Sequence, residues 1–140
     1  MTLDRLYQSR ILELNRSPLH RGELEGATHE ARGTDALCGD DILVRLVVEG
    51  SRIEACAWTG EACAITTASA SMLAEWIAGR TVGTLRAAHA RFRALLADDG
   101  LPDDEELGEI NLLRAVADYP SRVRNALLPW ETVDRALESI

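Results

Sequence analysis

Apolar residues recur at intervals of three and four near the start of the chain: Leu3, Leu6, Tyr7, Ile11, Leu12 and Leu14. This spacing predicts an amphipathic helix over residues 3–14, because side chains three or four positions apart share one helix face. The next segment, residues 15–33, contains one proline and three glycines and predicts mostly loop.

The pattern then changes to one that is typical of strands. Residues 41–48 are largely apolar and rich in β-branched side chains, and residues 52–58 alternate between polar and apolar positions. The residues between them, Glu49, Gly50 and Ser51, predict a tight turn, so the two strands should form a hairpin. A third strand near residues 29–36 is expected, because an isolated hairpin is only marginally stable in water.

Helical spacing returns after Cys63. It predicts a long helix over residues 64–78 that ends at Gly79, a second helix over 84–97, a short helix near 105–116, and a last helix from Tyr119 to about residue 138. This order predicts an α+β fold in which a small antiparallel three-stranded sheet packs against several helices. The length fits a single domain over residues 1–140.

Charge and composition narrow the function. The net charge is −8, which argues against nucleic-acid binding because a phosphate-binding face needs clustered basic side chains. All 15 basic residues are arginine, which excludes Schiff-base and P-loop chemistry that depends on lysine. The start lacks the pattern of a signal peptide, and no apolar run approaches the roughly 20 residues of a membrane span. We therefore expect a cytoplasmic chain without membrane attachment.

The candidate chemistry lies at the two ends of the predicted hairpin. Cys38, Gly39 and Asp40 come directly before the first strand, and Cys63 begins the long helix, where unpaired backbone N–H groups favour an anionic thiolate. Since a hairpin returns the chain close to its start, two thiols and a carboxylate can meet at one end of the sheet. Such a set can bind zinc or iron. The alternative is that each cysteine is a small buried apolar residue.

Other candidates have simpler interpretations. Cys56 lies mid-strand between two alanines, so we predict that it belongs to the core or to a sheet face. The histidines, His20, His29 and His89, do not cluster in the sequence and are expected at the surface. The acidic stretch 98–106 is expected to be a solvated loop, with docking of a basic partner as the alternative.

Three stretches resemble signatures of a known family: Leu-Cys-Gly-Asp at 37–40, Gly-Glu-Ala-Cys-Ala-Ile-Thr-Thr-Ala-Ser-Ala-Ser-Met-Leu at 60–73, and Tyr-Pro-Ser-Arg-Val-Arg-Asn-Ala-Leu-Leu-Pro-Trp at 119–130. The family is the iron–sulfur cluster assembly scaffolds, which include IscU, SufU and the N-terminal domain of NifU. The extra stretch near residues 96–115 is similar to SufU rather than to IscU. This resemblance covers nearly the whole chain.

The resemblance implies a site and a partner. In the family, three cysteines and one aspartate surround zinc, iron or a nascent iron–sulfur cluster, and a cysteine desulfurase of the SufS type delivers persulfide sulfur to one thiol. By position, Cys38 is then the sulfur-carrying nucleophile, and the metal ligands are Cys38, Asp40 and Cys63. The chain would act as a sulfur acceptor, as a scaffold, or both. The alternative is a non-catalytic, metal-free partner of the desulfurase that keeps only the docking surface.

The last signature departs from the family at one position. Asn125 stands where SufU-like chains have the third cysteine, and a neutral amide oxygen is a poor ligand for a borderline-soft metal. A metal or cluster is therefore expected to bind weakly or not at all. Pro129 has no N–H for the carbonyl of Asn125, four residues earlier, so we expect the last helix to kink or restart there.

Overall fold

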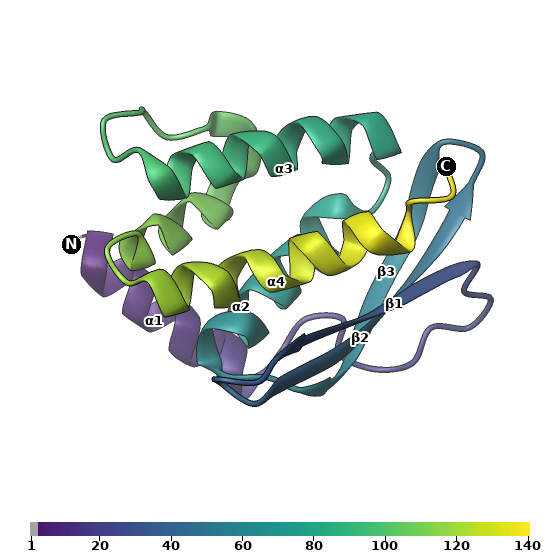
Figure 1. Ribbon diagram of the computed structural model, residues 1–140, viewed down its shortest axis with the longest axis horizontal. Coiled ribbons are helices and arrows are strands. Elements are labelled where there is room, and N and C mark those ends of the chain that lie inside the picture. The colour runs from purple at the N-terminus through teal and green to yellow at the C-terminus, as the bar shows by residue number, and fades with distance from the viewer. Residues whose placement is uncertain (1–2) are drawn as a thin grey trace.

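A three-stranded antiparallel sheet carries helices α2 and α4 against one face (Figure 1). The computed structural model describes residues 3–140. Its strands, in the order β1-β2-β3, are β1 (His29–Asp35), β2 (Asp40–Glu49) and β3 (Arg52–Glu61). Its helices are α1 (Leu3–Arg16), α2 (Ala64–Ile77), α3 (Val82–Ala97), the 3₁₀ helix η1 (Glu105–Val116) and α4 (Pro120–Ala136). The predicted α+β class and the third strand are confirmed.

The core forms between the sheet and its helices. Alternate residues of β2, including Ile42, Val44 and Leu46, are buried, as expected for a strand with one covered face. The run of alanines and serines in α2 is buried almost completely and lets α4 approach closely. Ser69 of this run donates a hydrogen bond to the backbone carbonyl of Ala126, at 2.5 Å, so even its polar atoms are used between the two helices.

Strand β1 also approaches α4 closely, at a glycine. A Cβ atom at Gly33 would lie 2.0 Å from Oγ1 of Thr132 and 3.3 Å from Cδ1 of Leu128. Any larger residue at this position would require the side chain of Thr132 to shift. The contact fixes the strand that leads into the turn between β1 and β2.

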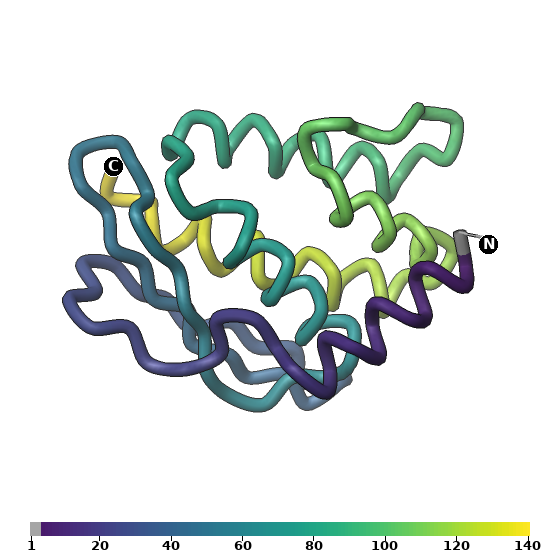
Figure 2. The backbone as a smooth tube through the Cα atoms, turned by 180° about the vertical axis from the view of Figure 1, so that it is seen from behind, coloured from purple at the N-terminus to yellow at the C-terminus, as the bar shows by residue number. Residues whose placement is uncertain are grey.

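The outer edge of β3 is covered by the chain's own segments. Near one end, Gly22 N–H donates to the carbonyl of Trp58 at 2.8 Å, and Trp58 N–H donates to the carbonyl of His20 at 3.1 Å. Near the other, Ile53 N–H donates to the carbonyl of Arg80 at 2.8 Å. Figure 2 shows the segment that follows α1 looping back along the sheet. These contacts leave less free strand edge for pairing with another chain.

Two local expectations are wrong. The helical backbone of α4 continues through Pro129, so the expected interruption does not occur. The backbone carbonyl of Asn125 receives no hydrogen bond from Pro129, because proline has no N–H. It lies 3.4 Å from the hydroxyl of Thr66 instead. His89 is buried rather than at the surface, because its Nδ1 lies 2.6 Å from Asp134 and its ring packs beside Trp130. Within residues 3–140, none of the helices combines the length and apolar character that crossing a membrane requires.

Candidate functional site

Cys38 lies on the turn between β1 and β2 and is exposed. The turn depends on Gly39, whose φ of 72° is in the left-handed region that favours glycine. Next to Cys38 in the chain, Leu37 is 82% exposed. Asp40 begins β2 and is only 2% exposed, so the turn presents a thiol to solvent and directs a carboxylate inward.

Cys63 lies at the N-terminus of α2, directly after β3. β3 continues to Glu61, three residues beyond the predicted end, and Glu61 pairs with Asp41 of β2. The start of β2 and the start of α2 are therefore neighbours. The structure brings Asp40 and Cys63 together at one end of the sheet, as predicted from the hairpin.

Both oxygens of the buried Asp40 carboxylate accept hydrogen bonds. Its Oδ1 accepts from the backbone N–H of Cys63 at 2.7 Å. Its Oδ2 accepts from the hydroxyl of Thr66 at 2.6 Å and from Nδ2 of Asn125 at 2.8 Å. A buried charge is costly unless it is paired or hydrogen-bonded, and three donors, two at the start of α2 and one on α4, meet that requirement here.

The side chain of Asn125 forms hydrogen bonds with both Asp40 and Cys38. It lies on α4, is 2% exposed, and accepts a hydrogen bond at Oδ1 from the thiol of Cys38 at 3.4 Å. The thiol of Cys63 lies 3.3 Å from the hydroxyl of Thr66 and 3.8 Å from Oδ2 of Asp40. Sequence reasoning missed Thr66. Its signal was its position three residues after Cys63, on the same helix face.

Both thiols open into one depression of about 430 Å³. Its lining residues come from the turn, α2 and α4: Cys38, Cys63, Ala64, Ile65, Ser121, Arg122 and Asn125. Arg122 brings a positive charge to the wall and stacks over the ring of Tyr119, 4.9 Å from its centroid. Burial raises the pKa of the nearby Tyr7, the charge of Arg122 lowers it, and the charge of Cys63 raises it further.

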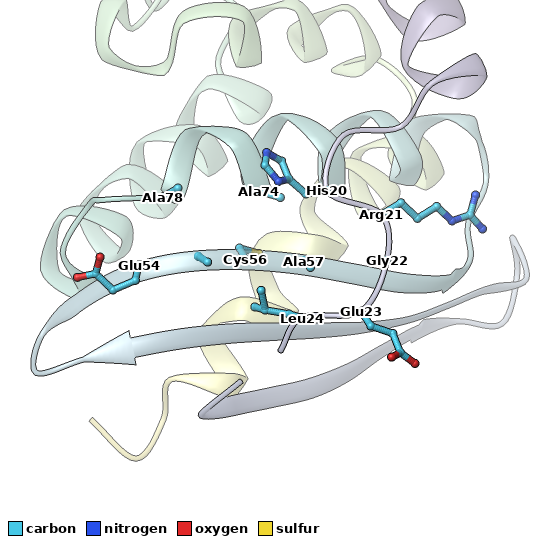
Figure 3. Close-up of a pocket in the computed structure, with 11 residues that line it drawn as sticks. His20, Arg21, Gly22, Glu23, Leu24, Glu54, Cys56, Ala57, Ala74 and Ala78 are labelled. Carbon is cyan, nitrogen blue, oxygen red and sulfur yellow. The ribbon is translucent and has the colours of Figure 1, made fainter. Parts of the chain in front are cut away.

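Cys56 belongs to a different part of the molecule, as predicted for a core residue. It is 6% exposed and lines a second depression, of about 360 Å³, between the loop at His20 and Arg21, strand β3 and helix α2 (Figure 3). Burial raises the pKa of the Cys56 thiol to about 12. It therefore stays protonated and is not a third thiol for the site.

This donor set does not fit a closed zinc site with four protein ligands. Zinc in closed sites takes four nitrogen or sulfur ligands, or a carboxylate in place of one. Here there are two thiols, one carboxylate that already accepts three hydrogen bonds, and one neutral amide. Among residues 3–140, no three His, Cys, Asp or Glu side chains are grouped so that they could hold a metal.

Comparison with known proteins decides the family. The model of the NifU-like N terminal domain matches residues 6–126, which is most of the chain. The chain belongs to the NifU-like N-terminal domain family. The resemblance to IscU, SufU and NifU is thereby confirmed, and the chain is of the IscU/SufU type of iron–sulfur cluster assembly scaffold.

Individual relatives of this NifU-like chain agree with the family. It is 29% identical over 136 residues to the iron–sulfur cluster assembly scaffold protein IscU of Streptococcus pyogenes, covering 97% of this chain and 85% of that protein. It is 28% identical over 135 residues to the zinc-dependent sulfurtransferase SufU of Bacillus subtilis, covering 96% and 91%. The crystal structure of a NifU-like N-terminal protein from Brucella abortus superposes with a TM-score of 0.86 at 27% identity, covering 99% and 97%.

Proposed function

We propose that this NifU-like chain is a sulfur acceptor in iron–sulfur cluster assembly, and that Cys38 takes persulfide sulfur from a cysteine desulfurase. The observation that carries the proposal is the position of Cys38, an exposed thiol on a turn at the rim of a depression that a second thiol shares. A sulfur acceptor needs one accessible thiol, whereas a scaffold needs a full ligand set. The SufU of Bacillus subtilis, to which this chain is similar, is itself a zinc-dependent sulfurtransferase.

The reaction is thiol–persulfide exchange. The Cys38 sulfur attacks the outer sulfur of the donor's persulfide and forms a new S–S bond at Cys38. The S–S bond within the donor breaks, and the donor's cysteine leaves as a thiolate that takes up the proton lost from Cys38. The sulfur oxidation states are exchanged between the two partners, so no external oxidant or reductant is needed.

The surrounding residues position the acceptor for this step. Asn125 accepts the hydrogen bond of the Cys38 thiol and so orients the turn toward the depression. Arg122 on the wall supplies a positive charge that attracts the incoming persulfide anion. The hydrogen bonds around Asp40 hold the ends of β2 and α2 together without help from a metal.

Mass spectrometry tests the proposal. The purified chain is incubated with a cysteine desulfurase and free cysteine, and the peptide containing Cys38 is expected to gain the mass of one sulfur atom. Cys38→Ser should lose this gain, while Cys56→Ser, which removes a buried thiol away from the depression, should keep it. A wild-type chain without added sulfur on Cys38 would rule the acceptor role out.

A second candidate is a docking partner that stimulates the desulfurase without accepting sulfur. The exposed apolar side chains beside the depression favour it, since Leu37 and Tyr119 are 82% and 53% exposed. Desulfurase turnover separates the two candidates. Cys38→Ala should abolish stimulation if the chain accepts sulfur, and should leave it unchanged if the chain only docks. Leu37→Asp should weaken stimulation in both cases.

A further inference from the structure

We propose that Asn125 replaces a metal ion as the partner of Asp40, and that this one side chain keeps the site free of zinc and iron. The carboxylate is 2% exposed, so it needs a compensating partner inside the protein. Nδ2 of Asn125 donates to its Oδ2 at 2.8 Å, and Thr66 donates to the same oxygen at 2.6 Å. Both in-plane lone pairs of that oxygen are thereby occupied.

The orientation of the amide matches the groups on both of its sides. Its N–H group faces the negative carboxylate of Asp40, and its oxygen faces the S–H group of Cys38 at 3.4 Å. The amide thus satisfies an acceptor and a donor at once and adds no charge. With Asn125 in place, three hydrogen-bond donors compensate the buried carboxylate without a cation.

A cysteine at position 125 would reverse this situation. Its thiolate would lie beside Asp40, and two neighbouring anions in a buried site favour a cation between them. Together with Cys38 and Cys63 it would complete three sulfur ligands and one oxygen ligand, a set that suits zinc. The chain has three cysteines in all, and Cys56 is buried outside this depression, so no other thiol can take the fourth place.

Zinc retention measures the effect of this one side chain. Wild type and Asn125→Cys are loaded with zinc, passed through a desalting column with a weak chelator, and analysed for bound metal. Asn125→Cys should retain about one zinc per chain, as expected for a complete ligand set, and wild type should retain almost none. Two controls should retain as little zinc as wild type. One is Ser139→Cys, which adds a thiol at an exposed position near the C-terminus, and the other is the double variant Asn125→Cys/Cys63→Ala.

A second measurement uses the wild-type chain alone, in case the new cysteine impairs folding. A ligand that binds only the folded state raises the melting temperature. We expect the same melting temperature of wild type in excess zinc and in excess chelator. One zinc per wild-type chain that disappears in Cys63→Ala, or a zinc-dependent rise in the melting temperature, would overturn the proposal. A folded Asn125→Cys that retains no more zinc than wild type would also overturn it. Sulfur transfer to Cys38 is measured separately, so the two proposals can fail independently.

Discussion

The side-chain carbonyl of Asn125 accepts a hydrogen bond from the thiol of Cys38, with 3.4 Å between the two heavy atoms. One residue lies on the turn between β1 and β2, and the other lies on the last helix. Through its amide nitrogen, Asn125 also holds the buried carboxylate of Asp40. The turn that carries the exposed thiol is therefore attached to the core by the side chain of Asn125.

Removing the buried carboxylate should destabilise the fold. Asp40→Ala leaves the N–H of Cys63, the hydroxyl of Thr66 and the amide of Asn125 without their acceptor. We expect the free energy of unfolding to fall by about 3 kcal/mol, since hydrogen bonds to a charged group are strong and buried donors are costly to leave unpaired. Urea denaturation measures the change.

The neighbouring aspartate provides the matched control. Asp41 pairs with Arg32 at the surface, where solvent screens ion pairs, so Asp41→Ala should lower the free energy of unfolding far less than Asp40→Ala does. Equal effects at Asp40 and Asp41 would contradict the hydrogen-bond network described around Asp40.

The contact between Gly33 and Thr132 predicts a coupled pair of mutations. Gly33→Ala places a methyl group 2.0 Å from Oγ1 of Thr132 and should cost about 2 kcal/mol through overpacking. Thr132→Ala removes that oxygen, so the double variant should be more stable than the sum of the two single changes predicts. Strict additivity in urea denaturation would show that β1 does not approach α4 as closely as described.

Much of this arrangement follows from local patterns. The alternation in 52–58 and the β-branched run in 41–48 predict the hairpin, and the hairpin brings Asp40 close to Cys63. The contacts made by Asn125 do not follow in the same way. That its amide contacts both Cys38 and Asp40 depends on how α4 packs against α2, and no local spacing in the sequence encodes that packing.

The expectation about Pro129 fails for a related reason. Proline removes one backbone donor, and in an isolated helix that loss favours a break. In the folded chain α4 is packed between other elements, and Thr66 of α2 lies within 3.4 Å of the carbonyl that loses its donor. The same long-range packing buries His89, because its partner Asp134 lies on a different helix.

The cysteines should differ sharply in reactivity. Cys56 is buried and its pKa is raised to about 12, so almost none of it is thiolate near neutral pH. Brief treatment of the native chain with iodoacetamide should label Cys38 and leave Cys56 unmodified. Peptide mass spectrometry measures how much of each cysteine is labelled. After unfolding in urea, all three cysteines should react, and labelling of Cys56 in the native chain would contradict its placement in the core.

The pair formed by Arg91 and Asp104 predicts an acid-dependent contribution to stability. The side-chain hydrogen bond from Arg91, at 2.6 Å, lowers the pKa of Asp104, and burial opposes this effect. A lowered pKa in the folded state stabilises the protein above the ordinary carboxyl pKa of about 4, and this stabilisation is lost as the pH falls through the lowered value. Arg91→Ala should therefore be less stable than wild type near neutral pH.

Urea denaturation at several pH values checks this dependence. The difference in the free energy of unfolding between wild type and Arg91→Ala should narrow as the pH falls below about 4. Arg93→Ala, on the exposed face of the same helix, serves as the control and should show a small difference that does not depend on pH. If the difference in the free energy of unfolding between wild type and Arg91→Ala widens in acid, the pKa of Asp104 is not lowered in the folded protein.

We expect Cys38 to accept sulfur without a bound metal. The most direct measurement is peptide mass spectrometry after incubation with a cysteine desulfurase and free cysteine, with a strong chelator present throughout. We expect one added sulfur atom on the peptide that contains Cys38, to the same extent with and without the chelator. If the added sulfur is lost when the chelator is present, or appears on Cys63 in place of Cys38, then Cys38 is not a metal-independent sulfur acceptor.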